Sequence, residues 1–413
     1  MASCTYLVTP KNERGNARSV LTETLSSSEM AQMRKHRQSR ILGVIRKLGL
    51  DGLILFSTEN VRYSTDFRPL ISVWFQASYA CIVTAQGRFI LLSNYGDLDR
   101  IVAEKPWADD VVGYPSGGRA RVLLKELEKG GVKGRRIGFD SAPYSLLSTL
   151  NGESSGRYEF VDVSNELALA RAVKHPAEVK VMRRGGEVLG EAVLATAAAA
   201  KPGMTEADVS ALAEASCRRR GAEGVSWSFA TFAGENAAAF ARHDSLKVLR
   251  EGEFLIMGYA AIFGGYNTDI TVTVPVGRWS KKHSEVYRAA YEGLEAALKS
   301  TKQKASAKSL RDIALKVIRE RGFGSLPFSD YQPVFHGIGM NVYEPPRAPE
   351  PRSDAPDDTL EAGNTIAMET LILVRDLPKL GGVRVGQTLL VTERGYEPIT
   401  WAWPESHFEM LGR

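Results

Sequence analysis

Residues 252–277 read GEFLIMGYAAIFGGYNTDITVTVPVG, which is typical of two buried strands joined by a tight turn. The first strand is an apolar run, a Gly-Gly-Tyr turn follows it, and the second strand alternates apolar residues with threonine. Asp269 lies near the middle of this second strand, where a charged side chain is unusual. The segment therefore predicts a β-hairpin that carries one ligand-type carboxylate.

Two more ligand-type side chains lie in apolar segments downstream of this hairpin. His336 lies in FHGIGMNVYEPPR (335–347), between an apolar strand and a Gly-x-Gly turn. Glu369 lies inside the apolar strand of NTIAMETLIL (364–373). Taken singly, a buried His is more often a satisfied core residue, and a strand Glu is more often paired or at an edge. Together with Asp269, they indicate a functional site.

The chain is long enough for two domains, and its apolar periodicity places a boundary near residue 172. We expect an N-terminal arm over 1–28, a smaller mixed α/β domain over 29–172 and an α+β domain over 173–413. The boundary lies at a Lys-His-Pro break, which is followed by an amphipathic helix. Helices of the second domain are expected near 177–200, 205–221, 282–299 and 307–322.

The composition excludes several classes of protein. With 53 basic and 48 acidic residues among 413, the formal net charge is only +5, and the basic residues are scattered, which disfavours nucleic-acid binding. Cys4, Cys81 and Cys217 are widely spaced, as is typical of a reducing cytoplasm. No uncharged run approaches the roughly 20 residues that span a bilayer, and the polar N-terminus lacks a signal-peptide core. We therefore expect a cytoplasmic protein that binds neither nucleic acid nor a membrane.

In this order and spacing, the three segments resemble the C-terminal catalytic domain shared by methionine aminopeptidase, proline aminopeptidase, prolidase, creatinase and dimethylsulfoniopropionate lyase. The tail GGVRVGQTLLVTERG (381–395) extends the resemblance. The N-terminal half, with NVRYSTDFRPLISVWFQASYACIVT (60–84), is most similar to the creatinase and dimethylsulfoniopropionate lyase branches. The resemblance implies an α+β fold, with a pita-bread catalytic domain preceded by a smaller mixed α/β creatinase-type domain.

Metallopeptidases of this family hold two metal ions with two Asp, one His and two Glu, because carboxylates must bridge two ions that repel each other. Here the second Asp, the His and the first Glu fall on Asp269, His336 and Glu369. The first Asp falls on Gly258 and the last Glu on Gly386, and glycine offers no side-chain donor. We therefore expect no two-metal centre and no cofactor.

The creatinase branch works without a metal, and the resemblance to it implies a different set of site residues. His243, in FARHDSLKVLREGE (240–253), is the candidate for proton transfer. Arg347 and Arg68 are candidates for binding a substrate carboxylate, with Phe67 beside Arg68. In creatinase the partner subunit supplies the equivalent Phe and Arg. The resemblance thus implies a homodimer in which each N-terminal domain closes the partner's site.

Other side chains are expected to line the substrate pocket. They are Tyr343, Trp74, Asn267 and Arg384. Asn267 stands where creatinase has a Tyr, which makes creatine itself a poor candidate substrate. Trp74 also has a simpler interpretation as an aromatic residue of the core or of a subunit interface.

Three functions follow from these residues. The leading hypothesis is a metal-independent enzyme that hydrolyses a C–N bond in a small carboxylate-bearing molecule. In it His243 moves protons, Asp269 with Glu369 holds the polar or cationic end, and His336 is a further catalytic residue. The second is a hydrolase or lyase with a single divalent metal on Asp269, His336 and Glu369. The third is a pita-bread binding module without catalysis.

Overall fold

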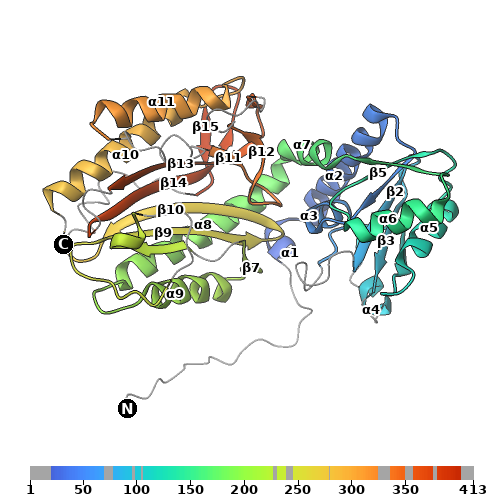
Figure 1. Cartoon of the computed structure of the whole chain (residues 1–413), viewed down its shortest axis with the longest axis horizontal. Helices are drawn as coiled ribbons and strands as arrows, with labels where there is room; N and C mark the ends of the chain where they lie inside the picture. The colour runs from blue at the N-terminus through green and yellow to red at the C-terminus, as the bar shows by residue number, and fades with distance from the viewer. Residues whose placement is uncertain are drawn as a thin grey trace, which may run out of the picture.

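The computed structural model of the chain describes residues 20–68, 78–94, 98–103, 106–226, 230–238, 245–278, 280–323, 335–348, 357–374 and 379–400. His243, Trp74 and most of the expected arm lie outside the described residues. The fold class expected from the sequence is confirmed, since a smaller mixed α/β domain precedes a larger α+β domain (Figure 1). The exact domain limits stay a prediction.

The N-terminal domain is built around a mixed sheet with six strands among the described residues. Its order is β4-β3-β2-β1-β5-β6, in which β2 is antiparallel to both β1 and β3, and the other neighbours are parallel. The strands are β1 (Gly52–Leu55), β2 (Tyr79–Thr84), β3 (Phe89–Ser93), β4 (Asp110–Gly113), β5 (Arg136–Phe139) and β6 (Glu159–Asp162). The helices are α1 (Val20–Thr24), α2 (Ser27–Leu48), α3 (Thr58–Thr65), α4 (Leu98–Ala103), α5 (Arg119–Lys129), α6 (Tyr144–Ser154) and α7 (Ser164–Ala172).

The C-terminal domain carries a larger sheet, with nine strands among the described residues. Its main order is β12-β11-β13-β14-β10-β9-β7, with β15 paired to β14 and β8 to β9. The strands are β7 (Gly224–Val225), β8 (Ala230–Ala233), β9 (Phe254–Phe263), β10 (Tyr266–Pro275), β11 (Phe335–Gly337), β12 (Glu344–Arg347), β13 (Thr365–Val374), β14 (Gly381–Val391) and β15 (Tyr396–Pro398). The predicted hairpin is thus confirmed as β9 and β10.

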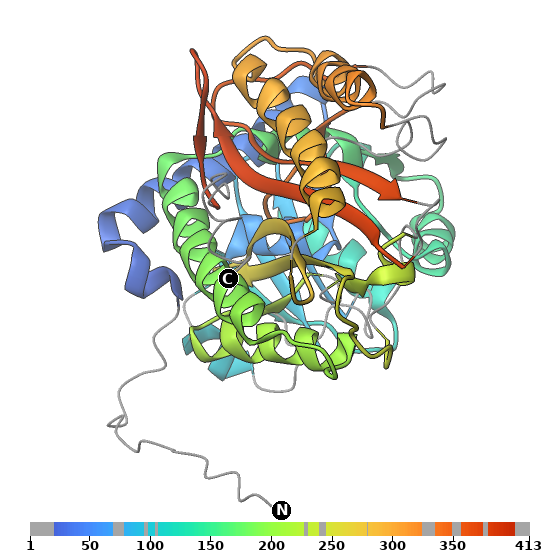
Figure 2. The same cartoon turned by 90° about the vertical axis from the view of Figure 1, so that its left-hand side faces the viewer.

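Two pairs of helices cover this sheet. The helices are α8 (Pro176–Ala199), α9 (Glu206–Arg219), α10 (Lys281–Ser300) and α11 (Ala307–Glu320), with a short 3-10 helix η1 (Gly234–Asn236). Helix α8 packs on β9 and β10, whereas α10 packs on β13 and β14. Figure 2 shows α10, in orange, crossing the red strands β13 and β14. In the described part of the chain, every helix is too short or too polar to span a bilayer.

The turn between β9 and β10 shows why glycine is needed at the centre of the predicted hairpin. Gly264 and Gly265 both have positive φ, at 53° and 84°. A Cβ at Gly264 would lie 2.7 Å from Leu21 Cδ2, and one at Gly265 would lie 2.4 Å from Arg62 Nε. The turn therefore needs two residues without side chains, both for its backbone conformation and for its close approach to the N-terminal helices.

A fully buried arginine joins the two domains. Arg37, on α2, donates from Nε to Glu178 Oε1 on α8 at 3.3 Å and from Nη2 to the Tyr266 hydroxyl on β10 at 2.5 Å. Tyr266 in turn donates to Glu178. The guanidinium also lies 5.4 Å from the Tyr63 ring centre and 5.2 Å from that of Trp107. We call Arg37, Glu178 and Tyr266 the domain junction.

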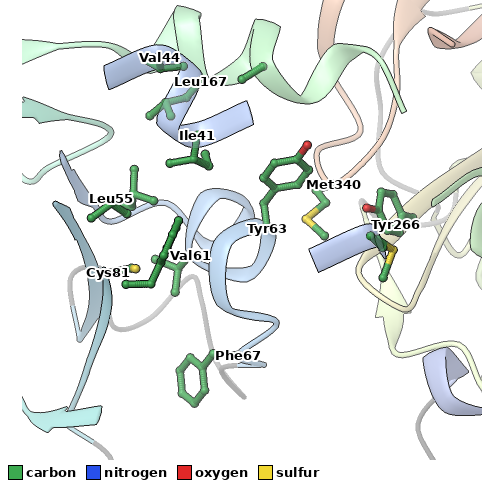
Figure 3. Packing of buried hydrophobic residues seen from close by; sticks show 14 of the residues in the cluster. Ile41, Val44, Leu55, Val61, Tyr63, Phe67, Cys81, Leu167, Tyr266 and Met340 are labelled. Atoms are coloured by element: carbon green, nitrogen blue, oxygen red, sulfur yellow. The ribbon is translucent and has the colours of Figure 1, made fainter. Parts of the chain in front are cut away.

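Apolar packing surrounds the domain junction. Figure 3 shows one cluster of buried side chains that runs from Leu55 and Val61 past Tyr63 to Met340 and Tyr266. The first three belong to the N-terminal domain and the last two to the C-terminal domain. Because a single apolar core crosses the boundary, the domains are held together by packing as well as by charge.

A second buried ion cluster links the domains through β12. Glu344 accepts from Lys174 Nζ at 2.7 Å and from Arg171 Nη2 at 3.3 Å. Arg171 also donates to Asn60 on α3, and Asn60 donates to Asp140 at 2.5 Å. The network therefore runs from the end of β5 to the loop region that follows His336.

We expect Arg37→Met to lower the free energy of unfolding by about 3 to 5 kcal/mol, because it leaves Glu178 buried without its cation. Urea unfolding measures this. The matched control is Arg184→Met, since Arg184 pairs with Glu187 at 3.0 Å on the exposed surface of α8; it should shift the same free energy by about 0.5 kcal/mol or less. Equal losses of unfolding free energy in the two variants would show that Arg37 stabilises the fold no more than an exposed ion pair does.

Candidate functional site

The candidate site begins with a row of residues that face each other across four neighbouring strands. Glu369 on β13 lies opposite Gly386 on β14, which lies opposite Thr271 on β10, which lies opposite Gly258 on β9. Residues directly opposite in a ladder point to the same face of the sheet, as do residues two apart on one strand. Asp269 therefore shares this face, and the two glycines leave the row without side chains at two of its four positions.

Glu369 is buried but fully partnered. Its Oε2 accepts from Arg384 Nε at 2.8 Å and also from Arg384 Nη2, and its Oε1 accepts from the Thr271 hydroxyl at 2.7 Å. Burial alone would raise the pKa of Glu369, but contacts led by the Arg384 guanidinium and including the Thr271 hydroxyl together outweigh burial and hold this pKa below its usual value. Glu369 is therefore ionised at neutral pH, and its charge is balanced by Arg384.

Asp269 is held differently, because only its backbone is bonded. The Thr388 hydroxyl accepts from Asp269 N at 2.9 Å and donates to Asp269 O at 2.8 Å, and the Thr400 hydroxyl donates to the same oxygen at 3.1 Å. Asp269 is 1% exposed, and neither carboxylate oxygen has a hydrogen-bond partner among the residues that the structure describes. Burial, followed by repulsion from Glu369, raises the pKa of Asp269 well above its usual value. Such a group favours a positively charged or proton-donating ligand.

Besides the two carboxylate oxygens of Asp269, His336 has a buried nitrogen without a hydrogen-bond partner among the described residues. Its Nδ1 lies 3.1 Å from the Gly337 carbonyl oxygen, which can only accept, so Nδ1 carries the proton and Nε2 presents a lone pair. Nε2 is buried and has no partner within the described ranges of the chain. Burial lowers the pKa of His336, which keeps the ring neutral. The Tyr343 ring stacks on it with centroids 3.9 Å apart, and burial raises the pKa of Tyr343 to about 12.

Two more of the expected site residues lie close to His336. Arg347 is paired with His336 across β11 and β12, and its Nη2 donates to the Tyr343 carbonyl at 2.9 Å. Asn267 is buried on β10, donates to the Gly339 carbonyl at 2.8 Å and accepts from the Ser226 hydroxyl. The structure thus places both residues around the Gly-x-Gly turn after His336.

The expected N-terminal residues lie elsewhere in the described structure. Phe67 is buried within the N-terminal domain, edge-on to Tyr79 with ring centres 6.1 Å apart. Arg68 lies 3.4 Å from Asp66 and 4.0 Å from Glu223. The described ion pairs of Arg68 do not reach Asp269 or Glu369, and a role in a partner subunit stays a prediction. His243 and Trp74 fall outside the described residues.

Sequence reasoning missed how Arg384 and the threonines act. Arg384 was expected to bind substrate, but it is already engaged by Glu369. Thr271 and Thr388 received no role, although they position Glu369 and Asp269 respectively. The signal was present as the alternation of threonine with apolar residues in β10, because alternate residues of a strand share one face.

Two sequence signatures match the chain in order. That of the creatinase/prolidase N-terminal domain matches residues 37–173, and that of metallopeptidase family M24 matches residues 180–393, more than half of the chain.

Similar proteins cover nearly the whole chain. An Xaa-Pro dipeptidase of Pyrococcus horikoshii is 30% identical over 362 residues, which are 87% of this chain and 95% of the relative. The crystal structure of the prolidase from Pyrococcus horikoshii superposes with a TM-score of 0.77 at 26% identity, covering 89% of this chain and 99% of that one. The Xaa-Pro dipeptidase from Bacillus anthracis has the same fold, with a TM-score of 0.77 at 23% identity, covering 90% and 99% of the two chains.

These findings correct the functional prediction. We expected a metal-independent enzyme without a cofactor that hydrolyses a non-peptide C–N bond. This prediction is wrong, because the matching signature is that of a metallopeptidase family and the relatives are named as dipeptidases and prolidases. The resemblance to the wider family and the two-domain fold are confirmed.

A metallopeptidase signature implies metal ions, but the described residues do not fit the two-metal centre of the family. Gly258 and Gly386 offer no side-chain donor, and both carboxylate oxygens of Glu369 are already bonded by Arg384 and Thr271. In the part of the chain that the structure describes, no group of three or more His, Cys, Asp or Glu side chains is placed to hold an ion.

The two glycines of the row respond differently to an added side chain. A Cβ at Gly386 would lie 2.4 Å from Glu369 Cγ and 2.8 Å from the Met368 carbonyl oxygen, whereas one at Gly258 would meet nothing closer than Thr271 Oγ1 at 3.3 Å. We expect Gly386→Ala to lower the free energy of unfolding by about 1 to 3 kcal/mol and Gly258→Ala to change it by about 1 kcal/mol or less. Urea unfolding of both variants checks this, and the reverse order would contradict the packing around Glu369.

The raised pKa of Asp269 makes stability depend on pH. An acid with a raised pKa in the folded state stabilises the fold fully below its unfolded pKa, near 3.9, and this contribution is lost as pH rises through the folded pKa. In a chelating, peptide-free buffer, Asp269→Asn should therefore gain stability relative to the unmodified chain as pH rises from 4 to 8, by about 1 to 3 kcal/mol. Urea unfolding at several pH values measures the difference, and a pH-independent difference would refute an unpartnered carboxylate.

The two signatures lie in the same order as the two domains of the structure. The match with the Pyrococcus horikoshii dipeptidase extends over both of them. The chain therefore belongs to metallopeptidase family M24.

Proposed function

We propose that the chain recognises short peptides in its C-terminal domain, with Xaa-Pro dipeptides as the first class to test. The observation that carries this proposal is the buried carboxylate of Asp269, whose two oxygens find no partner in the described part of the chain. The names of the relatives, Xaa-Pro dipeptidase and prolidase, supply the class of peptide.

The charge of the site suits the amino end of a peptide. Arg384 already balances the charge of Glu369, whereas the pKa of Asp269 is raised, so Asp269 ionises when a cation enters the site and then carries one negative charge that Arg384 does not balance. An α-ammonium group carries one positive charge and three N–H donors, so it would balance that charge and satisfy the free oxygens together. A buried charge is tolerated only when it is paired and hydrogen-bonded in this way.

The other end of a dipeptide would find a cation near His336. Arg347 lies at the exposed end of β12, paired with His336, and keeps donors beyond the one that it gives to the Tyr343 carbonyl. Guanidinium groups bind carboxylates through two parallel hydrogen bonds. A ligand held between Asp269 and Arg347 would be a zwitterion, with its amide close to the lone pair of His336 Nε2.

Cleavage of the bound peptide is a second candidate function. The observation that favours it is the match over 87% of this chain with a protein named as a dipeptidase. The test is hydrolysis of an Xaa-Pro dipeptide panel by the purified chain, with and without added Mn²⁺, Co²⁺ or Zn²⁺. Release of proline that depends on an added ion would support cleavage. Binding of the peptide without release of proline under every condition would support recognition without cleavage.

Several finer expectations stay predictions. They are a degraded two-metal site, a place in the creatinase and dimethylsulfoniopropionate lyase branches, a cytoplasmic location, a homodimer with each N-terminal domain over the partner's site, and the absence of nucleic-acid and membrane partners. A carboxylate-bearing small ligand, also expected, is consistent with a dipeptide.

We expect calorimetry to show that Ala-Pro binds and that N-acetyl-Ala-Pro binds at least about tenfold more weakly, because acetylation removes the charged donors facing Asp269. Asp269→Asn should weaken Ala-Pro binding by a similar factor. The control is Asp312→Asn, which removes a half-exposed carboxylate that pairs with Lys308 on α11; it should leave the affinity unchanged. Equal affinities for the free and acetylated peptides would overturn the role of Asp269.

A further inference from the structure

The opposite face of the same sheet contains a cavity that the proposed function does not use. It lies between α10 and β14 and has a volume of about 90 Å³. Among its lining residues are Tyr287, Tyr291, Leu294, Gly386, Gln387 and Tyr396. Gln387 follows Gly386 on β14, and its register partners are Ile270 and Met368, so its side chain points away from Asp269 and Glu369.

Gln387 carries the strongest sign of a ligand in this cavity. Gln387 is 2% exposed, and no described residue provides a hydrogen-bond partner for its amide nitrogen or amide oxygen. The surrounding cluster is apolar, with Leu294, Met368 and Val385 among its members. An unpaired amide in such surroundings destabilises the fold, and buried polar groups in native proteins almost always have partners. The amide therefore calls for a partner that the described protein does not provide.

Beside the cavity, β10 and β14 pair directly over only two residue pairs. These are Ile270 with Gln387 and Thr271 with Gly386. On one side of them the Thr388 hydroxyl bonds to the Asp269 backbone, and on the other the Thr273 hydroxyl bonds to the Arg384 backbone. Side chains thus replace backbone ladder bonds on both sides of the pairing that contains Gln387.

The chemistry of the walls defines a class of ligand. The Tyr287 and Tyr291 rings are stacked, with centroids 6.5 Å apart, and suit a flat molecule. Gln387 offers two N–H donors and one carbonyl acceptor side by side, a pattern that another amide matches with two antiparallel hydrogen bonds. Lys299 and Glu295 pair with each other at 3.5 Å on partly exposed side chains, which leaves no net charge on this stretch of the lining. A neutral ligand is therefore favoured over an ion.

We propose that this cavity binds a small neutral amide, held by paired hydrogen bonds to Gln387 between α10 and β14. Its volume is smaller than the roughly 150 Å³ of an apolar cavity that accepts benzene, so the ligand has about five or six non-hydrogen atoms inside the protein. Thr271 lines the cavity and also donates to Glu369. The cavity and the candidate peptide site are thus neighbours through one threonine, although the proposal does not depend on peptide binding.

The test uses 2-pyrrolidinone, a cyclic amide with adjacent donor and acceptor. Chemical shifts of the Leu294 and Leu298 methyl groups are followed by NMR during a titration of the full chain. We expect saturable shifts with the amide, and binding about tenfold weaker for cyclopentanone, which has the same ring size but only an acceptor.

The matched variant is Gln387→Met, which preserves side-chain volume and removes the amide. It should fold with equal or greater thermal stability, and it should bind 2-pyrrolidinone at least about tenfold more weakly, so that its preference for 2-pyrrolidinone over cyclopentanone is lost. A crystal structure with the amide soaked in should show it on Gln387. Ordered water alone at Gln387 after soaking, or equal 2-pyrrolidinone affinity in the chain and the variant, would overturn the proposal.

Discussion

The short pairing of β10 with β14 is the constraint on which both sites depend. Only two residue pairs form direct ladder contacts, and the Thr388 and Thr273 hydroxyls replace the ladder on either side. Because hydroxyls bond to the backbone of Asp269 and Arg384, these two side chains are held in the sheet without using their own charged groups. On the other face, the same arrangement leaves space beside Gln387. The charged site and the cavity thus lie on opposite faces of the sheet at this one irregular strand pair.

Charge compensation in the candidate site is uneven, and this unevenness gives the site its chemistry. Glu369 and Asp269 are similarly buried and close enough to raise the pKa of the latter. The Arg384 guanidinium bonds to Glu369, and no described residue bonds to the Asp269 carboxylate, so in the described structure one carboxylate is satisfied and the other is not. Removing a charge from water is favourable only when a partner repays the lost hydration. An external cation would supply the positive charge and the hydrogen-bond donors for Asp269. A cationic ligand therefore gains more binding energy at Asp269 than at Glu369.

The sequence predicted most of the fold but only part of the site. Apolar runs and helical periodicity predicted the β9–β10 hairpin, α8 to α11, and the strand positions of Asp269 and Glu369, because these features depend on local pattern. They placed His336 between a strand and a turn, whereas it lies in β11. The engagement of Arg384 by Glu369 depends on the register between β13 and β14, which is a long-range property that spacing does not contain. The functional prediction failed for another reason. The missing ligands at Gly258 and Gly386 indicate which metal ligands the site lacks, but they carry no information on the substrate that the family uses.

The N-terminal domain and the boundary segment contact two strands next to the candidate site, β10 and β12. Arg37 binds Tyr266, which starts β10 three residues before Asp269. Arg171 and Lys174, at the boundary between the domains, bind Glu344, which starts β12 directly after Tyr343, the residue that stacks on His336. Both contacts are buried ion clusters, so their geometry is specific and their loss is costly. The relative positions of Asp269 and His336 therefore depend on how the two domains pack. Changes at the domain junction would thus alter the affinity of a ligand that binds both residues.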